Sequence, residues 1–176
     1  MVAQLPAISV NDDSSQKLPL TVGYFKDLCS RFMSEKSAKL AEKLTLEPPV
    51  EPVSTGSVFL DEWYEKERCL RLALAQIRAL KMKKDIKDLP SASDGESIQA
   101  ARTATGMDSP LAAEQYLNQY RLGILDRISP LDNFSVDAVY SYGLKLMLAE
   151  RMKKFNKDEG LSSYHKIYDE ILGEKK

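Results

Sequence analysis

The sequence predicts an all-α protein, an irregular helical bundle built around one long central helix, with a short extended segment at the N-terminus. The segment from Ser57 to Lys84 contains neither glycine nor proline, and its middle turn is apolar on nearly every side. Such a helix must be surrounded by other helices. In several further segments apolar residues recur at three- and four-residue steps, which is the spacing of amphipathic helices.

The composition is that of a single folded domain. The 176 residues are 43% hydrophobic and 29% charged, and a single helical domain over 1–176 is expected, with a possible division into two lobes near 88–107. With 25 basic and 26 acidic residues, no overall field favours binding to nucleic acid. No apolar run is long enough for direct membrane insertion, and the first ten residues lack the basic flank of a secretory signal, so we expect a cytoplasmic protein.

The first part of the chain predicts an extended segment and two helices. Val2 to Val10 is apolar and β-branched, and it is expected to lie extended against the helices. Thr21 is a candidate N-cap for a helix to about Met33, and Ser34 for a short helix through Leu44. The expected buried face of the first helix consists of Tyr24, Phe25, Leu28, Cys29 and Phe32. Prolines end the second helix in a connector over 47–52.

The central helix is expected to begin after the cap Ser57, with acidic residues near its N-terminus and lysines near its C-terminus, as the helix dipole favours. One stripe of this helix is predicted to be buried. It consists of Phe59, Trp63, Leu70, Ala73, Leu74, Ile77 and Leu80. Both cysteines, Cys29 and Cys69, are expected to be reduced core residues, because they lack the spacing of metal or redox motifs.

The second half predicts three further helices after a polar stretch. Residues 88–107 are small and polar, so we expect a mobile loop with at most a marginal helix from Glu96 to Thr105. Asp108-Ser109-Pro110 is a strong helix start, and that helix is expected to reach Ile128 with Leu117, Tyr120, Ile124 and Ile128 buried. A helix from Ser135 to about Phe155 has Gly143 in its apolar face, which predicts a close helix crossing. A last helix runs from about Asp158 to Gly173.

The sequence offers no recognisable catalytic or ligand-binding chemistry. The only histidine, His165, has a single carboxylate at helical spacing, Asp169, and such pairs are common on solvated helices. No nucleophile elbow or phosphate-binding loop is present. Adjacent acids such as Asp61-Glu62 and Asp158-Glu159 lie where helix dipoles favour negative charge, so they are interpreted as capping residues. We therefore expect no enzyme activity, no cofactor, no metal and no small-molecule substrate.

Charged residues beside the central apolar stripe are the best candidates for a binding surface. Glu67, Arg71 and Arg78 flank the stripe, and Arg68 lies on another side of the helix. One interpretation is internal ion pairing between helices, because arginines in a deeply placed helix need carboxylate partners. The other is an exposed seam that binds an acidic partner helix, in which case Arg68, Arg71 and Arg78 are the partner-binding residues.

Several patches of the chain resemble a small bacterial family associated with V-type ATPases, whose members look like the C (or d) subunit of these rotary enzymes. The patches are Val2 to Pro6, Thr21 to Phe25, Trp63 to Arg71, Leu74 to Ala79, Phe134 to Leu146, and Glu150-Arg151. The resemblance implies a non-catalytic α-helical socket that joins the central rotor stalk to the membrane ring. Its partners would be other ATPase subunits, and it would be peripheral to the membrane through them.

A second function from a different class is compatible with the same residues. The chain could be a free-standing helical adaptor that binds a partner helix in a groove. The groove is then predicted to be lined by Tyr116, Tyr120, Tyr140 and Tyr164. Recovery of ATPase subunits with the protein would distinguish the two hypotheses.

Overall fold

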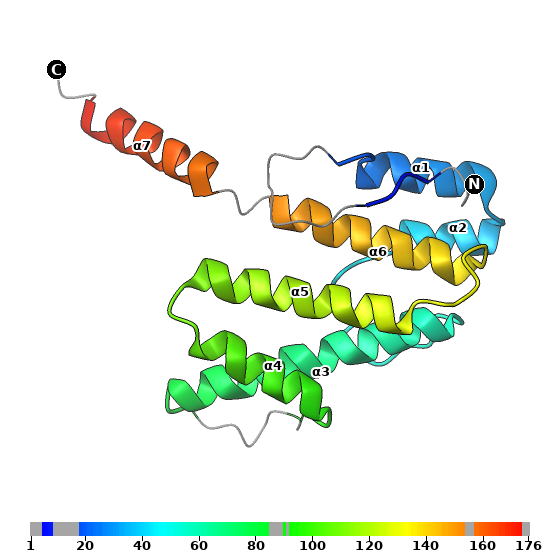
Figure 1. Ribbon diagram of the computed structural model, residues 1–176, viewed down its shortest axis with the longest axis horizontal. Helices are drawn as coiled ribbons and strands as arrows, with labels where there is room; N and C mark the ends of the chain where they lie inside the picture. Colours follow the sequence, from blue (N-terminus) through cyan, green and yellow to red (C-terminus); the bar gives the residue numbers. More distant parts are fainter. Residues whose placement is uncertain (1–4, 9–17, 85–89, 91, 154–156, 174–176) are drawn as a thin grey trace.

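The computed structural model describes residues 5–8, 18–84, 90, 92–153 and 157–173, with backbone only for 157–159. Over these residues it has seven α-helices and no strand, which confirms the all-α prediction (Figure 1). The helices are α1 (Val22–Phe32), α2 (Glu35–Glu42), α3 (Val58–Lys81), α4 (Gly95–Gly106), α5 (Pro110–Ile128), α6 (Val136–Lys153) and α7 (Lys157–Gly173).

The predicted helix starts are confirmed by their caps. The side chains of Thr21, Ser34, Ser57 and Ser109 each accept a hydrogen bond from the backbone N–H three residues later. Pro110 occupies the first turn of α5, where its missing N–H has no cost. These short polar side chains satisfy backbone donors that the helix leaves unpaired, so local sequence alone fixes where these helices begin.

The long helix α3 occupies the position that its apolar sequence predicts. It packs against α4, α5 and α6, and Leu60, Trp63 and Leu70 are at most 1% exposed. The predicted stripe is buried as far as Leu74, but the inclusion of Leu80 is wrong, because its side chain is 59% exposed. Leu80 lies in the last turn of α3, where the adjacent Ala79 is buried, so Leu80 is on the uncovered side of that turn.

Helix α1 buries a narrower face than predicted. Phe25 and Cys29 are at most 1% exposed, whereas Tyr24 and Phe32 are 51% and 66% exposed. Both cysteines are reduced and buried, as expected, and burial raises the pKa of the Cys29 thiol to about 11. The apolar stripe of α1 is therefore wider than the face that is buried, because α2 and α6 are the helices that pack closely against α1.

Helix α4 is more substantial than its sequence predicts. Twelve residues form it, with Asp94 as N-cap, and Ala100, Ala101 and Ala104 are all buried. Small side chains let its backbone approach α3 closely, so tertiary packing compensates for weak intrinsic helix formation. The expectation of at most a marginal helix from Glu96 to Thr105 is therefore wrong, whereas residues 90 and 92–94 lie outside any helix, as the predicted loop requires; 85–89 and 91 lie outside the described residues.

Asp94 joins the cap of α4 to α3, and its contribution should depend on pH. The hydroxyl of Ser97 donates to the Asp94 carboxylate at 2.5 Å, and this hydrogen bond lowers the pKa of Asp94. Burial raises that pKa in part, and the positive charge of Lys66 on α3 lowers it further. Replacing Asp94 with alanine is expected to cost about 1 kcal/mol at pH 7. Because the folded pKa is the lower one, the difference from wild type should shrink as pH falls below about 4, towards the folded pKa. Urea unfolding at several pH values measures this difference.

Gly143 marks a helix crossing, as predicted. A Cβ atom at this position of α6 would lie 2.6 Å from Cε1 of Phe25 in α1 and 3.1 Å from Cδ1 of Leu44. The Phe25 ring is 1% exposed and has little room to move. Only glycine therefore allows α1 and the residues after α2 to approach α6 this closely.

A matched pair of glycine substitutions should separate this crossing from helix propensity. We expect Gly143→Ala to destabilise the protein by roughly 1–3 kcal/mol, because the new methyl group overlaps the Phe25 ring. Gly123→Ala in α5, where no atom lies within 4 Å of the added Cβ, should stabilise by about 0.4–1 kcal/mol. Chemical denaturation of both variants measures these changes. Equal effects would contradict the assigned crossing.

The buried apolar residues form two clusters. The larger joins α1, α2, α5 and α6 to the first half of α3, and the smaller joins the second half of α3 to α4 and α5. Tyr120 contacts both. Residues 5–8 are non-helical and Leu5 and Ile8 pack on the larger cluster, whereas residues 2–4 and 9–10 of the extended segment expected over Val2 to Val10 lie outside the described residues.

Candidate partner-binding surfaces

The carboxylate of Glu67 is the centre of the charged seam on α3. It is 1% exposed and accepts two hydrogen bonds from Arg121 of α5, from Nε and Nη2, each at 2.9 Å. Arg71 Nε also donates to it at 2.8 Å. Glu67 therefore takes part in the internal ion pairing between helices that one interpretation of the sequence predicts, with Arg121 as its partner on α5 and Arg71 as a second partner on α3 itself. Sequence reasoning missed Arg121, although its position in the buried face of α5, between Leu117 and Leu125, indicates a paired arginine.

Arg68 and Arg71 also hold the proline connector against α3. Arg68 donates to the carbonyl of Pro49 at 3.2 Å and to Glu65 at 2.5 Å, and Arg71 donates to the carbonyl of Leu46 at 3.4 Å. These contacts explain how a segment without regular structure keeps a fixed path. Arg68 and Arg71, two of the predicted partner-binding residues, therefore direct most of their guanidinium nitrogens to groups within the chain.

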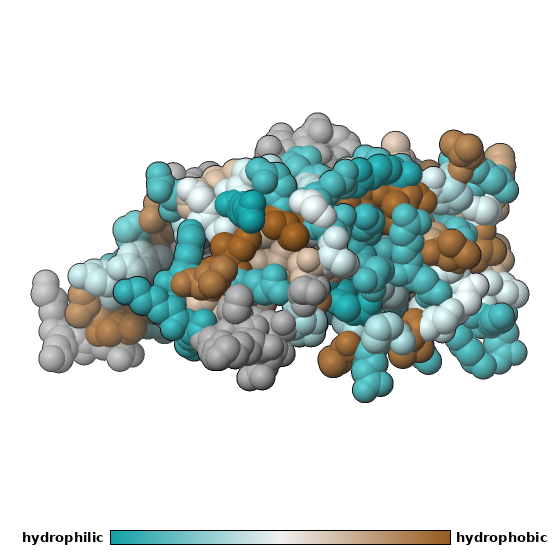
Figure 2. Space-filling view, turned by 90° about the horizontal axis from the view of Figure 1, so that it is seen from below, coloured by the Kyte–Doolittle hydropathy of each residue, from teal (hydrophilic) through white to brown (hydrophobic). Residues whose placement is uncertain are grey.

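Arg78 differs from the other two arginines because it is exposed and forms no ion pair with a described residue. Met82, 60% exposed, follows four residues later on the same side of the helix end, and Leu80, 59% exposed, lies on another side of the last turn. We call Arg78, Leu80, Lys81 and Met82 the α3 tip. Lys81 donates to the carbonyl of Thr105, which ties the tip to α4. Figure 2 views the molecule from the side on which α3 and α4 lie and shows hydrophobic residues interspersed with hydrophilic ones. The α3 tip is thus a basic and partly apolar surface.

The four tyrosines of the predicted groove do not come together. Tyr140 is 1% exposed, and its hydroxyl donates to the carbonyl of Ser37 at 3.1 Å, so it is a core residue. Tyr164 lies on α7. Tyr116 and Tyr120 line a shallow groove of about 450 Å³ between α4 and α5. The four-tyrosine groove is therefore wrong, and a smaller two-tyrosine groove replaces it.

The groove between α4 and α5 has a floor of small side chains and a charged rim. Ala100 of α4 and Gly123 of α5 line the groove together with the two tyrosines. At the rim, Arg127 binds Glu96 through two hydrogen bonds of 2.8 and 2.9 Å. The pKa of Glu96 is lowered mainly by the hydrogen bond from Arg127 and, to a smaller extent, by the positive charge of Arg127. An apolar surface of this shape suits contact with a helix rather than enclosure of a small molecule.

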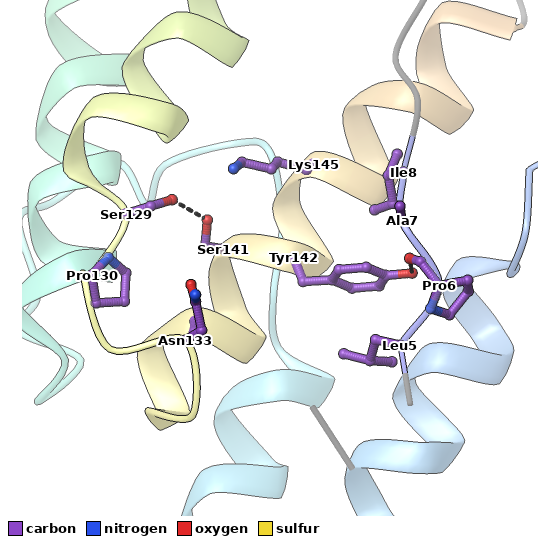
Figure 3. A pocket seen from close by; sticks show the side chains of 11 residues that line it. Leu5, Pro6, Ala7, Ile8, Ser129, Pro130, Asn133, Ser141, Tyr142 and Lys145 are labelled. Carbon is purple, nitrogen blue, oxygen red and sulfur yellow. Dashed lines mark hydrogen bonds between the residues drawn. The ribbon is translucent and has the colours of Figure 1, made fainter. Parts of the chain in front are cut away.

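A second pocket, of about 360 Å³, lies between the extended segment and the turn that joins α5 to α6 (Figure 3). The Tyr142 hydroxyl donates to the carbonyl of Pro6 at 2.9 Å and so holds the extended segment. Ser129 and Ser141 hydrogen-bond each other at 2.6 Å. The ammonium of Lys145 pairs with Asp126 at 2.7 Å. The polar groups around this pocket thus bind one another, and neither serine contacts a histidine or carboxylate among the described residues.

Helix α7 carries the largest set of exposed apolar side chains. Every described side chain from Gly160 to Gly173 is exposed, and Figure 1 shows α7 projecting from the end of the helical body. The apolar side chains are Leu161, Tyr164, Ile167, Tyr168, Ile171 and Leu172, each between 50% and 69% exposed. The predicted helix is confirmed over Lys157–Gly173, and no described part of the body covers its apolar face.

His165 does not form the pair with Asp169 that helical spacing allows. Its ring instead contacts that of Tyr164 edge-on, with centroids 5.7 Å apart. Within the described part of the chain no three His, Cys, Asp or Glu side chains are grouped as metal ligands would be. In the same residues no helix combines the length and hydropathy needed to cross a bilayer.

Comparison with known proteins finds a similarity to one family over part of the chain. Residues 95–175, which span α4 to α7, match the family described as "Protein of unknown function (DUF2764)". No curated protein and no solved structure matches the chain. The matched region contains the two-tyrosine groove and the exposed face of α7, whereas the α3 tip and the central ion pair's Glu67 precede it.

Proposed function

We propose that this protein is a non-catalytic subunit of a V-type ATPase, a helical socket similar to the C (or d) subunit that links the central rotor stalk to the membrane ring. The resemblance of the Trp63 to Arg71 and Phe134 to Leu146 segments to a family associated with these enzymes supports the proposal. In the fold these two segments lie on α3 and α6, which contact each other. The resembling residues therefore belong to one packed unit.

The observation that carries the proposal furthest is the exposed α3 tip. Arg78 and Lys81 supply positive charge, and Leu80 and Met82 supply exposed apolar surface, at the end of the longest helix. A surface of this kind is complementary to an acidic amphipathic helix, in which apolar contacts give affinity and ion pairs fix orientation. The stalk of a rotary enzyme would present such a helix to its socket.

The packing behind the α3 tip suits a passive mechanical role. Force applied at the tip would pass along α3 to Glu67, which is bonded to Arg121 of α5 in a buried environment. The second cluster of apolar residues clamps the same half of α3 between α4 and α5. Packed interiors deform little, so this arrangement transmits displacement rather than absorbing it.

Pull-down from native membranes tests the proposal. With the full chain as a saturating bait, we expect co-purification of V-type ATPase stalk or ring subunits. Arg78→Glu combined with Leu80→Asp should abolish that recovery without lowering the thermal midpoint, because both side chains are exposed. Lys36→Glu, an exposed charge reversal on α2, is the matched control and should leave recovery unchanged. Absence of ATPase subunits from the saturated bait would contradict the proposal.

A helical adaptor remains the second candidate, because the groove between α4 and α5 provides a surface for it. Tyr116 and Tyr120 flank a floor of small residues there. If the protein is an adaptor, Gly123→Leu, which fills the floor, should abolish partner recovery while the double variant at the α3 tip should not. The two variants therefore distinguish the candidate functions in one experiment.

A further inference from the structure

The six apolar side chains of α7 form one continuous face. At about 100° per residue, they occupy an arc of roughly 140° around the helix axis. The charged residues Lys166, Asp169 and Glu170 lie outside this arc. All six apolar side chains are at least half exposed, so the body supplies no cover for them. A contiguous face of this kind usually marks an interaction site.

The order of side chains along this face is nearly the same in both directions. Leu161 and Ile171 stand at its two ends, and Tyr164 and Tyr168 stand between them, their rings stacked 5.9 Å apart. These four positions follow alternating steps of three and four residues, the spacing of a two-helix seam. In an antiparallel pair of identical helices, Leu161 would face Ile171 and Tyr164 would face Tyr168. Aliphatic side chains then meet aliphatic ones, and tyrosine meets tyrosine.

We propose that α7 is a self-association helix that pairs with α7 of a second copy of this chain, antiparallel and about a two-fold axis near Lys166. A two-fold interface uses the same surface on both copies, so self-complementarity is the property it requires. The charged side chains lie away from the seam and therefore do not oppose one another across it. Because α7 projects from the body (Figure 1), its apolar face is accessible to the second copy.

Other occupants fit these observations less well. Among the described side chains of α7, Lys166 is accompanied on the polar side by two acidic residues, Asp169 and Glu170. This side of the helix is therefore not basic and does not suit binding to an anionic membrane surface. A different protein partner would not require the mirrored order of aliphatic and aromatic side chains. This inference does not depend on the proposed function, which rests on the α3 tip.

Sedimentation equilibrium of the full chain is the first test. We expect a monomer–dimer equilibrium whose dimer fraction rises over roughly a hundredfold range of concentration. Tyr168→Asp places a charge in the seam and should weaken the dimer by more than about tenfold. Ser163→Asp, which lies outside the apolar arc of α7, should leave it unchanged. The thermal midpoint of the body should stay the same in both variants, since α7 packs on none of it.

Cysteine cross-linking tests the antiparallel geometry. Chains carrying Tyr164→Cys, mixed with chains carrying Tyr168→Cys, should form a mixed disulfide dimer faster than either does alone, and Ser163→Cys should not cross-link. The native Cys29 and Cys69 are buried and serve as internal controls. A single monomeric species at every concentration would overturn the proposal. So would cross-linking that is faster for Tyr164→Cys with itself, or equally fast through Ser163→Cys.

Discussion

Replacing Trp63 with alanine will lower the free energy of unfolding by about 3–5 kcal/mol. The indole of Trp63 is 0% exposed and lies in the larger apolar cluster, where α3 meets α1, α5 and α6. Truncation to alanine removes a large buried apolar surface, and the surrounding helices cannot close the resulting cavity because their other contacts hold them apart. For a domain of this size such a loss lowers the thermal midpoint by about 10 °C or more.

A matched exposed aromatic residue gives the control for Trp63. Phe134, in the turn before α6, is 76% exposed, and Phe134→Ala should change the unfolding free energy by less than about 0.5 kcal/mol. Urea denaturation of both variants measures the difference. If Trp63→Ala unfolds at the wild-type denaturant concentration, the position of α3 at the centre of the bundle is wrong.

Removing the carboxylate of Glu67 should have an effect of similar size for a different reason. In Glu67→Leu, the guanidinium of Arg121 keeps its charge at a 5% exposed position but loses both hydrogen bonds to its acceptor. An unpaired buried charge of this kind costs about 3–5 kcal/mol. Arg71→Leu should cost roughly 0.5–1.5 kcal/mol, because its side chain is 37% exposed and Glu67 retains Arg121.

A double variant separates the loss of the ion-pair attraction from the cost of leaving the Arg121 charge buried without a partner. Glu67→Leu combined with Arg121→Leu replaces the buried pair by apolar side chains, and such replacements are often close to neutral. We therefore expect the double variant to be more stable than Glu67→Leu alone, as measured by denaturant unfolding in a double-mutant cycle. If the two losses simply add, the side chains do not interact and the assigned ion pair is wrong.

Local chemistry allowed the helix boundaries to be predicted. Caps at Thr21, Ser34, Ser57 and Ser109 depend on hydrogen bonds and backbone angles within a few residues, so they can be recognised without knowledge of the fold. The helix crossing at Gly143 could also be predicted, because a glycine in the apolar face of a helix usually allows another segment to pack close to the helix backbone.

The candidate surfaces were harder to predict, because exposure depends on what packs against each face. Identical arguments from spacing predicted burial for Leu80 and Phe32, which are exposed, and placed Tyr140, a core residue, in a binding groove. Arg71 and Arg78 have the same residue type and lie on the same helix, yet one binds Glu67 and the other does not. Glu67 lies four residues before Arg71 on α3, whereas Leu74 lies four residues before Arg78, and only the position of α5 reveals that Arg121 also binds Glu67.

The sequence by itself determined that the chain is helical, where its helices begin, and which of its helices is central, because these properties follow from periodicity and capping over short distances. The tertiary structure decided that α4 is a full helix, that Glu67 joins α3 to α5, and that the apolar face of α7 is left uncovered. Each of these depends on contacts between residues far apart in the chain. Burial and ion pairing are properties of two surfaces together, and a single segment specifies only one of them.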